Sequence, residues 1–406
     1  MFDQLFDCPL AVARYRNGPL LKERVAFLTH LANQGYTRNT LKEYAGSLLA
    51  IARVFGRAAS LPKALTVSEL RRKMSRQRSL FPLAVRWLRF VGRLRERSAP
   101  LTRWDKKIKA FAVDMERVAE LRPRTIDCRC WWVRQFFERL RVKGSSLRKI
   151  TPRQIDMAFQ KMLAPEAKSR TPGAYSRETI QGCATALRTF FRFAEARGWC
   201  CRGLAASIRN PRVFSQSSLP LGPSWEDVKR LLAMTEGDQP TNIRDRPMLM
   251  LLAIYGLRQG EVSHLRLEDI DWEHEVFRVI SSKSRQPRTY PLMRSVGDAI
   301  LCYLRKVRPR STHRELFLSL RAPFRPVRSL WGMVGRRLRS LGVSLPHYGP
   351  HALRHACASR LLAAGLSLKE IGDQLGHRDP DTTRIYAKVD LVGLRQVADF
   401  ELGGVL

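Results

Sequence analysis

The chain has few acidic residues and no long apolar stretch, and both absences limit what it can be. It carries 36 Asp and Glu against 73 Lys and Arg in 406 residues, a formal net charge of +37. Such an excess describes the partners of a protein rather than its fold, and it favours polyanions. No apolar run approaches the roughly 18 residues of a membrane-spanning helix. The N-terminus also lacks the basic start and apolar stretch of a signal peptide.

Cofactor-binding patterns are absent too. The eight cysteines form no disulfide framework, because Cys200 and Cys201 are adjacent. Cys128 and Cys130 have one residue between them, whereas zinc knuckles typically have two. The chain has no Gly-x-x-x-x-Gly-Lys loop of the kind that binds nucleotide phosphates. We therefore expect no cofactor and no metal site, and a reducing, bacterial-type cytoplasm.

What the chain does have is enough apolar sequence to fold. Apolar residues make up 44% of it, which disfavours a ribosomal-type basic protein or a charged tail. A chain of 406 residues is long enough for two or three domains with their own cores.

The pattern along the chain predicts three parts and a linker. Residues 1–97 have apolar residues at helical spacing and form a helical module of uncertain role. Residues 103–208 have capped helix starts followed by aromatic-rich amphipathic runs, which predicts a bundle of four or five helices. Residues 209–223 are rich in Pro and Ser and read as a linker. Residues 224–406 are mostly helical with one small antiparallel sheet, so the fold class is mainly α with a mixed α/β final domain.

Two basic residues of this last part are candidates for binding a phosphate. Arg258 follows a Gly-Leu pair after an apolar helix, and Glu261 is near enough to hold its guanidinium. Lys283 lies at the predicted turn after strand 276–280, where it could reach a phosphate oxygen or protonate a leaving alkoxide. In so basic a chain, a solvated surface arginine and a plain basic turn are the ordinary alternatives.

The remaining candidates lie within a short stretch. His351 and Arg354 are three residues apart, so they share one face of a helix. His355 points about 100° away from Arg354, and we expect it to be a core or supporting residue. His377 follows a glycine at a helix end, and Tyr386 comes nine residues later. A lone tyrosine usually packs, but this one is a nucleophile candidate because arginine, lysine and histidine donors can converge on one phosphate.

These motifs resemble the tyrosine recombinase (phage integrase) family. The resemblance covers roughly residues 220–392, and residues 103–208 are more loosely similar to the helical, SAM-like core-binding domain of that family. Six positions match in the family's order and at similar spacing: Arg258, Lys283, His351, Arg354, His377 and Tyr386.

The resemblance implies a site-specific DNA recombinase or integrase. It would cleave and rejoin strands through a 3′-phosphotyrosyl intermediate, without metal or ATP. Tyr386 would attack phosphorus, His351 would be the favoured partner for its proton, and Lys283 would protonate the departing 5′ oxygen.

The resemblance also assigns the groups that hold the phosphate. Arg258 and Arg354 would bind the non-bridging oxygens, and His377 would donate a further hydrogen bond. Glu261 and His355 would support these residues.

The partners implied are double-stranded DNA and three further copies in a tetramer on DNA, or other recombinases in a mixed assembly, with no membrane. We therefore expect the protein to be associated with the bacterial nucleoid. The additional N-terminal region and the strong basicity favour a protein of a mobile element. Residues 390–406 are apolar enough to pack either on their own domain or on a neighbour. Two other functions remain open: relaxation of DNA by a type IB topoisomerase, and non-catalytic DNA binding by an accessory protein of a mobile element.

Overall fold

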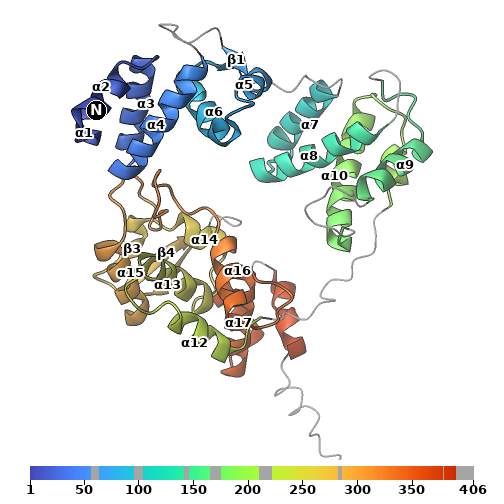
Figure 1. Cartoon of the computed structure of the whole chain (residues 1–406). Helices are drawn as coiled ribbons and strands as arrows, with labels where there is room; N and C mark the ends of the chain where they lie inside the picture. Colours follow the sequence, from blue (N-terminus) through green and yellow to red (C-terminus); the bar gives the residue numbers. More distant parts are fainter. Residues whose placement is uncertain are drawn as a thin grey trace, which may run out of the picture. The chain divides into compact units, whose positions relative to one another are not determined.

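The computed structural model confirms a mainly helical chain with one small antiparallel sheet (Figure 1). It describes residues 1–55, 64–95, 104–140, 146–164, 175–209, 222–281, 286–377 and 379–389. Lys283, most of the predicted linker and the segment 390–406 lie outside the described residues. The chain divides into two compact units, one of residues 1–95 and 216–406 and one of residues 96–215.

The N-terminal helices surround an apolar core in which Phe27, Leu48 and Trp87 are fully buried. The fourth helix begins where the hydroxyl of Thr37 accepts a hydrogen bond from the backbone N–H of Thr40, which is an N-cap. The elements are α1 (Phe2–Leu5), α2 (Pro9–Arg16), α3 (Leu21–Asn33), α4 (Arg38–Val54), β1 (Leu65–Thr66), α5 (Val67–Lys73), η1 (Arg78–Leu80), α6 (Phe81–Phe90) and β2 (Leu94–Arg95).

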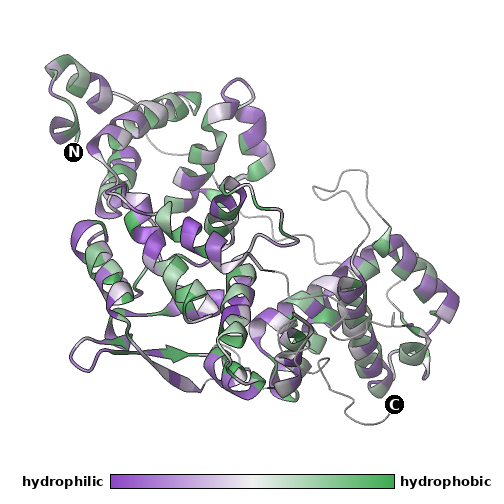
Figure 2. Ribbon diagram, turned by 90° about the horizontal axis from the view of Figure 1, so that it is seen from below, coloured by the Kyte–Doolittle hydropathy of each residue, from purple (hydrophilic) through white to green (hydrophobic). Residues whose placement is uncertain are grey.

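The second unit has an aromatic core. Phe111, Phe136 and Phe190 are buried in it, and edge-to-face ring contacts join Phe111 to Phe190 and Phe136 to Phe191. Figure 2 shows its helices with a hydrophobic and a hydrophilic side, as expected for amphipathic helices around one core. The elements are α7 (Asp105–Arg117), α8 (Pro123–Arg139), α9 (Pro152–Leu163), α10 (Arg177–Ala196) and α11 (Leu204–Ser207).

The C-terminal part combines helices with a three-stranded antiparallel sheet in the order β3-β4-β5. In β4, Phe277 and Val279 are buried while Arg278 and Ile280 are exposed, and Phe277 pairs with Tyr290 of β5. The elements are α12 (Trp225–Ala233), α13 (Pro240–Ala253), α14 (Gln259–His264), η2 (Leu267–Asp269), β3 (Ile270–Asp271), β4 (Val276–Ile280), β5 (Pro287–Pro291), α15 (Arg294–Lys306), α16 (Trp331–Ser340), α17 (Pro350–Ala363), α18 (Leu368–Leu375), η3 (Pro380–Thr382) and η4 (Arg384–Val389).

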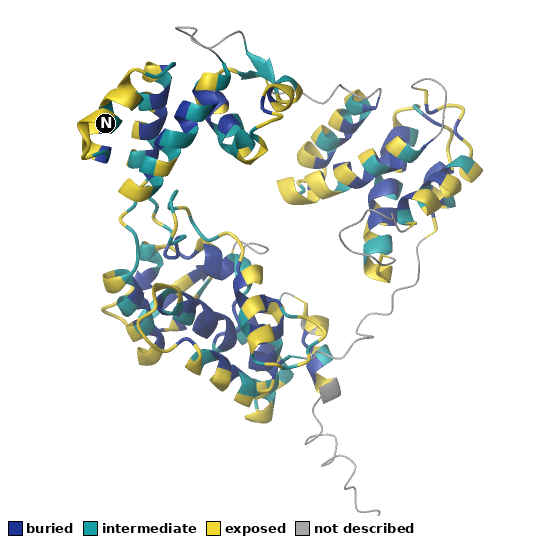
Figure 3. Cartoon of the chain, in the orientation of Figure 1, coloured by how far each residue is buried: buried dark blue, intermediate teal, exposed yellow. Residues whose placement is uncertain are grey.

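Helix α13 is the centre of this part, and its packing brings distant segments together. All its residues from 247 to 253 are buried, and it contacts α15 and α17 (Figure 3). Gly256, just beyond its end, has a φ of +62°, and a Cβ there would lie 2.4 Å from Cδ2 of Leu375. Glycine is therefore required both by the backbone conformation and by the close approach to the end of α18. This approach places the loop that carries Arg258 beside the end of α18.

The described residues include neither a membrane-spanning helix nor a cluster of metal ligands. No helix there combines the length and the apolar composition needed to cross a membrane. No group of three or more His, Cys, Asp or Glu residues in the same part of the chain is arranged to hold a metal ion. All eight cysteines, each of them described, are free thiols.

A buried ion pair at Asp245 of α13 should stabilise the C-terminal part of the chain. The residue is 4% exposed, and its carboxylate accepts hydrogen bonds from Arg244 at 2.7 Å and from Arg337 of α16 at 2.8 Å. Removing one partner of a buried pair leaves the other charge uncompensated, so we expect Asp245→Ala to lower the free energy of unfolding by about 3 kcal/mol. Urea unfolding would measure this.

The matched control is Asp298→Ala, which removes an exposed carboxylate whose ion pair spans 4.0 Å. Exposed pairs contribute little, so the midpoint should stay close to that of the unchanged protein. Equal midpoints for the two variants would contradict the role given to Asp245.

Candidate active site

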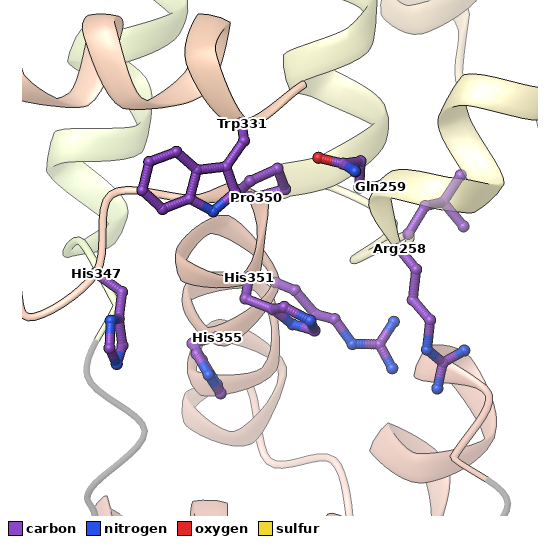
Figure 4. Close-up of a pocket in the computed structure, with 10 residues that line it drawn as sticks. Arg258, Gln259, Trp331, His347, Pro350, His351 and His355 are labelled. Carbon is purple, nitrogen blue, oxygen red and sulfur yellow. The ribbon is translucent and has the colours of Figure 1, made fainter. Parts of the chain in front are cut away.

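A cleft of about 480 Å³ collects several of the residues singled out from the sequence. Figure 4 shows Arg258, His351 and His355 among the side chains that line it, with Trp331 at the start of α16. Its lining is Leu257, Arg258, Gln259, Trp331, His347, Gly349, Pro350, His351, Arg354 and His355.

The two arginines converge on the C-terminal end of α18. Nη2 of Arg354 donates to the carbonyl of Leu375 at 2.8 Å, and Nη2 of Arg258 donates to the carbonyl of Gly376 at 3.0 Å. The last carbonyls of a helix lack helical partners and carry the negative end of its dipole, so they attract cations. Gly376 ends the helix with a φ of +65°. One helix end thus orients both guanidinium groups.

Burial makes Arg354 an unusual cation. The residue is 4% exposed, and it also donates to the carbonyl of Gly256. Desolvation, followed by the nearby charge of Arg258, lowers the pKa of Arg354 to about 10. It still carries its charge at neutral pH, inside a site where water screens that charge poorly.

A single buried carboxylate balances the arginines. Oε1 of Glu261 accepts from Nη1 of Arg258 at 3.1 Å and from Nη2 of Arg288 at 2.9 Å, and its side chain is 0% exposed. Oε2 accepts from the backbone N–H of Arg258 at 2.8 Å. The structure therefore places Glu261 where the sequence suggested, against the guanidinium of Arg258, and adds Arg288 as a second partner.

Arg288 and Tyr290, both on β5, belong to the site although the sequence did not single them out. The hydroxyl of Tyr290 donates to the carbonyl of Gln374 at 2.7 Å, and Arg288 donates to the same carbonyl at 3.3 Å and to the Tyr290 hydroxyl. Burial raises the pKa of Tyr290, which keeps its proton. Residues two apart on a strand share a face, and that spacing was the available signal. These contacts join the hairpin to the end of α18.

His377 is fixed directly beyond that helix end. Its Nδ1 lies 2.7 Å from the hydroxyl of Thr383, which is buried. Burial, and then the charges of Arg354 and Arg258, lower the pKa of His377 to about 4. The ring is neutral at pH 7, and Thr383 determines which way it faces.

Tyr386 lies on η4, 2% exposed, and burial raises its pKa to about 12. Its hydroxyl is 3.0 Å from Nδ1 of His355. The sequence favoured His351 as the partner for this hydroxyl, and in this conformation the structure places His355 there instead. His351 and His355 are four residues apart, so their rings share a face of α17, with centroids 6.4 Å apart. His355 is the one that packs against Tyr386, at a centroid separation of 5.7 Å.

The structure thus brings the described candidates together on the ends of a few elements. Lys283 lies outside the described residues, between the two strands of the hairpin. The candidates placed in or beside the cleft are Arg258, Glu261, His351, Arg354, His355, His377 and Tyr386.

Comparison with known proteins places the chain among the tyrosine recombinases. The model of the phage integrase family matches residues 224–391. The putative integrase/recombinase y4rF of Sinorhizobium fredii is 32% identical over 297 residues, which cover 72% of this chain and 68% of that protein. The tyrosine recombinase XerC of Alcanivorax borkumensis is 33% identical over 229 residues, 55% of this chain and 73% of XerC. The chain belongs to the phage integrase family of tyrosine recombinases.

Other relatives match over a smaller share of their length or through the fold. A second putative integrase/recombinase of Sinorhizobium fredii, y4rA, is 43% identical over 217 residues, and the match spans only 53% of its length. Among solved structures, the XerH site-specific recombinase bound to difH substrate has a TM-score of 0.55 at 17% identity, over 82% of this chain and 93% of that one. The Tn1549 transposon integrase in complex with a circular intermediate DNA has a TM-score of 0.52 at 19% identity, over 69% and 94%. These two structures show a shared fold.

Two half-buried histidines, His355 and His377, should make the fold sensitive to acid. Burial lowers the pKa of His355 and of His377 from 6.5 to about 4, whereas in the unfolded chain each takes up a proton near 6.5. Protonation between these values therefore favours the unfolded state. We expect the midpoint of urea unfolding to fall as the pH drops from 6.5 towards 4, and to fall less in the double variant His355→Asn/His377→Asn.

The control for this prediction is His274→Asn, because His274 lies on the exposed turn between β3 and β4. This variant should keep the pH slope of the unchanged protein. An equally steep slope in the double variant would show that the two half-buried rings are not the origin of the effect.

Proposed function

We propose that the protein is a site-specific DNA recombinase or integrase that breaks and rejoins strands through a 3′-phosphotyrosyl intermediate. The observation that carries the proposal is the convergence of Arg258 and Arg354 on one helix end, in a part of the chain that also holds Tyr386. Membership of the phage integrase family supports it, and relatives named as recombinases favour strand exchange over relaxation by a topoisomerase.

The two arginines would neutralise the scissile phosphate. A phosphodiester anion repels nucleophiles, so a catalyst must offset its charge and hold it in line. Each guanidinium has five N–H donors, and the side-chain hydrogen bonds of Arg258 to Glu261 and Gly376 use two of them. The remaining donors suit the non-bridging oxygens, where paired guanidinium forks would stabilise the pentacoordinate state. His377 would donate one more hydrogen bond to the phosphate.

Cleavage would proceed by attack of the phenol. The bond from Oη of Tyr386 to phosphorus forms while the bond from phosphorus to the 5′ oxygen breaks. The phenolic proton passes to a histidine of α17, and by resemblance His351 is favoured. Lys283 supplies a proton to the 5′ oxygen. The 5′ hydroxyl of another strand then attacks the phosphotyrosine, so bond energy is retained and neither ATP nor a metal ion is required.

The resting protomer would keep its nucleophile inactive. A buried phenol with a pKa of about 12 is almost fully protonated at neutral pH. Its deprotonation needs nearby cations and a proton acceptor. Since the phenol can attack only a phosphate that is already bound by the aligned guanidinium groups, cleavage would follow DNA binding rather than precede it.

Double-stranded DNA would be the partner. A net charge of +37 favours it, and much of the binding would come from salt-sensitive phosphate contacts. Residues 103–208 would form the helical core-binding domain, 209–223 the linker, 224–406 the catalytic domain and 1–97 an additional helical module. Exchange between two duplexes requires four nucleophiles, hence a tetramer on DNA, either of this chain or with other recombinases.

Replacing the nucleophile tests the proposal. We expect Tyr386→Phe to abolish the covalent protein–DNA adduct, because the attacking oxygen is removed, while DNA affinity stays within about twofold because phosphate contacts dominate it. The assay uses end-labelled, nicked fragments of the DNA that flanks the gene, followed by denaturing electrophoresis.

Tyr44→Phe is the control, since it makes the same change on α4, outside the cleft. It should form the adduct at the normal rate. Persistence of the adduct in Tyr386→Phe would show that another residue is the nucleophile.

A further inference from the structure

Tyr386, the proposed nucleophile, is hydrogen-bonded to His355. The family resemblance gives His355 only a supporting role. We propose that His355 is a further catalytic residue, whose Nδ1 holds the hydroxyl of Tyr386 and takes its proton during attack. This inference rests on the proposed function and deepens it.

The geometry of the pair supports direct proton transfer. Nδ1 of His355 and Oη of Tyr386 are 3.0 Å apart, and the ring centroids lie 5.7 Å apart. A proton acceptor must be within hydrogen-bond reach of the proton that it removes. Because Tyr386 is 2% exposed, bulk water has little access to its hydroxyl. His355 is therefore placed to receive the proton first.

His351 extends this pair to the cleft. It lies one helical turn before His355 on α17 and is exposed, and both rings line the cleft (Figure 4). The ring centroids are 6.4 Å apart, a separation that one bridging water can span. The order Tyr386, His355, His351 therefore forms a path from the buried phenol to the solvent of the cleft. In this arrangement His351 relays the proton rather than contacting the phenol.

The backbone before α12 covers His355 on another side. A Cβ at Gly222 would lie 3.1 Å from Cβ of His355 and 2.6 Å from the carbonyl oxygen of Ala352. Glycine at position 222 thus allows the chain to pass directly over the turn of α17 that carries His355.

The charges around His355 explain why no proton moves from Tyr386 to His355 in the absence of DNA. Burial, and then three neighbouring cationic or titratable groups, lower the pKa of His355 to about 4, so the ring is neutral. In the tautomer with its proton on Nε2, Nδ1 accepts the hydrogen bond of the phenol. A bound phosphate adds a negative charge that favours the imidazolium ring. The titratable or charged groups that face His355 are His347 from the preceding loop, His351 and Arg354 from α17, His377 from the end of α18 and Tyr386 from η4.

The step balances without an added reagent. As Oη bonds to phosphorus, the O–H bond of Tyr386 breaks and its proton moves to Nδ1 of His355. The electron pair of that O–H bond stays on Oη, which forms the new bond to phosphorus. The bond from phosphorus to the 5′ oxygen breaks, and its electron pair goes to the 5′ oxygen, which takes a proton from Lys283. In the reverse attack the phenolate leaves phosphorus, and the imidazolium of His355 or the relay through His351 returns the proton.

The decisive variant is His355→Asn. Asparagine keeps a polar atom near the position of Nδ1, so it can still hold the hydroxyl, but it cannot take up a proton. We expect the single-turnover rate of adduct formation to fall by about 100-fold, the scale of general base catalysis. The remaining rate should rise about tenfold per pH unit, as expected when hydroxide replaces a positioned base, and the unchanged protein should show a shallower profile. DNA affinity and the urea midpoint at pH 8 report whether the variant folds and binds.

His355→Gln is the second variant, because its polar group lies near Nε2 and no longer reaches the phenol. It should cleave more slowly than His355→Asn at every pH. His274→Asn, on the exposed turn after β3, makes the same change outside the site and should match the unchanged protein.

A 5′-bridging phosphorothiolate substrate separates the two ends of the reaction. Its sulfur leaves without protonation, so it should restore cleavage by Lys283→Ala but not by His355→Asn. Parallel pH profiles for His355→Asn and the unchanged protein, or full rescue of His355→Asn by this substrate, would overturn the inference. The inference would also be overturned if His351→Asn steepened the pH profile of adduct formation and His355→Asn did not. If the unchanged protein forms no adduct, the proposed function itself fails.

Discussion

The C-terminal end of α18 is the constraint on which the site depends. Three successive carbonyls at this end accept hydrogen bonds from other segments of the chain. The carbonyl of Gln374 accepts from side chains of β5, that of Leu375 accepts from Arg354, and that of Gly376, the C-cap, accepts from Arg258. A helix end has unsatisfied acceptors and a partial negative charge, so it can hold several donors at fixed directions. A rigid acceptor of this kind aligns the two guanidinium groups before any phosphate arrives, which is the preorganisation that electrostatic catalysis requires.

The charge balance of the site follows from the same arrangement. Glu261 is one buried carboxylate in contact with Arg258 and Arg288, while Arg354 lies nearby on backbone carbonyls. The cluster therefore keeps excess positive charge in a poorly solvated place, and this suits an anion. Burial, and then the charges of Arg354 and Arg258, hold His377 neutral at pH 7. Low solvation is thus common to the neutral histidine and the protonated phenol, whereas the charge of Arg354 lowers the pKa of both His377 and Tyr386.

The local patterns in the sequence predicted the elements well. The hairpin around β4 was recognisable because apolar and polar residues alternate along it, and the second half of α13 because residues 247–253 are all apolar. Arg258, His351, Arg354 and Tyr386 were recognisable as candidates because they sit in short motifs near helix ends. Lys283 remains a prediction, since it lies outside the described residues.

By itself, the sequence determined the mainly helical class, the basic character, the family and the residue types available for phosphoryl transfer, because composition and short motifs are local properties. Only the tertiary structure decided which groups meet. The ion pair of Arg288 with Glu261 joins residues 27 positions apart in the chain, and the contact of His355 with Tyr386 joins residues 31 positions apart. The packing of α13, α17 and α18 creates these contacts, and periodicity along one element cannot specify how three elements pack.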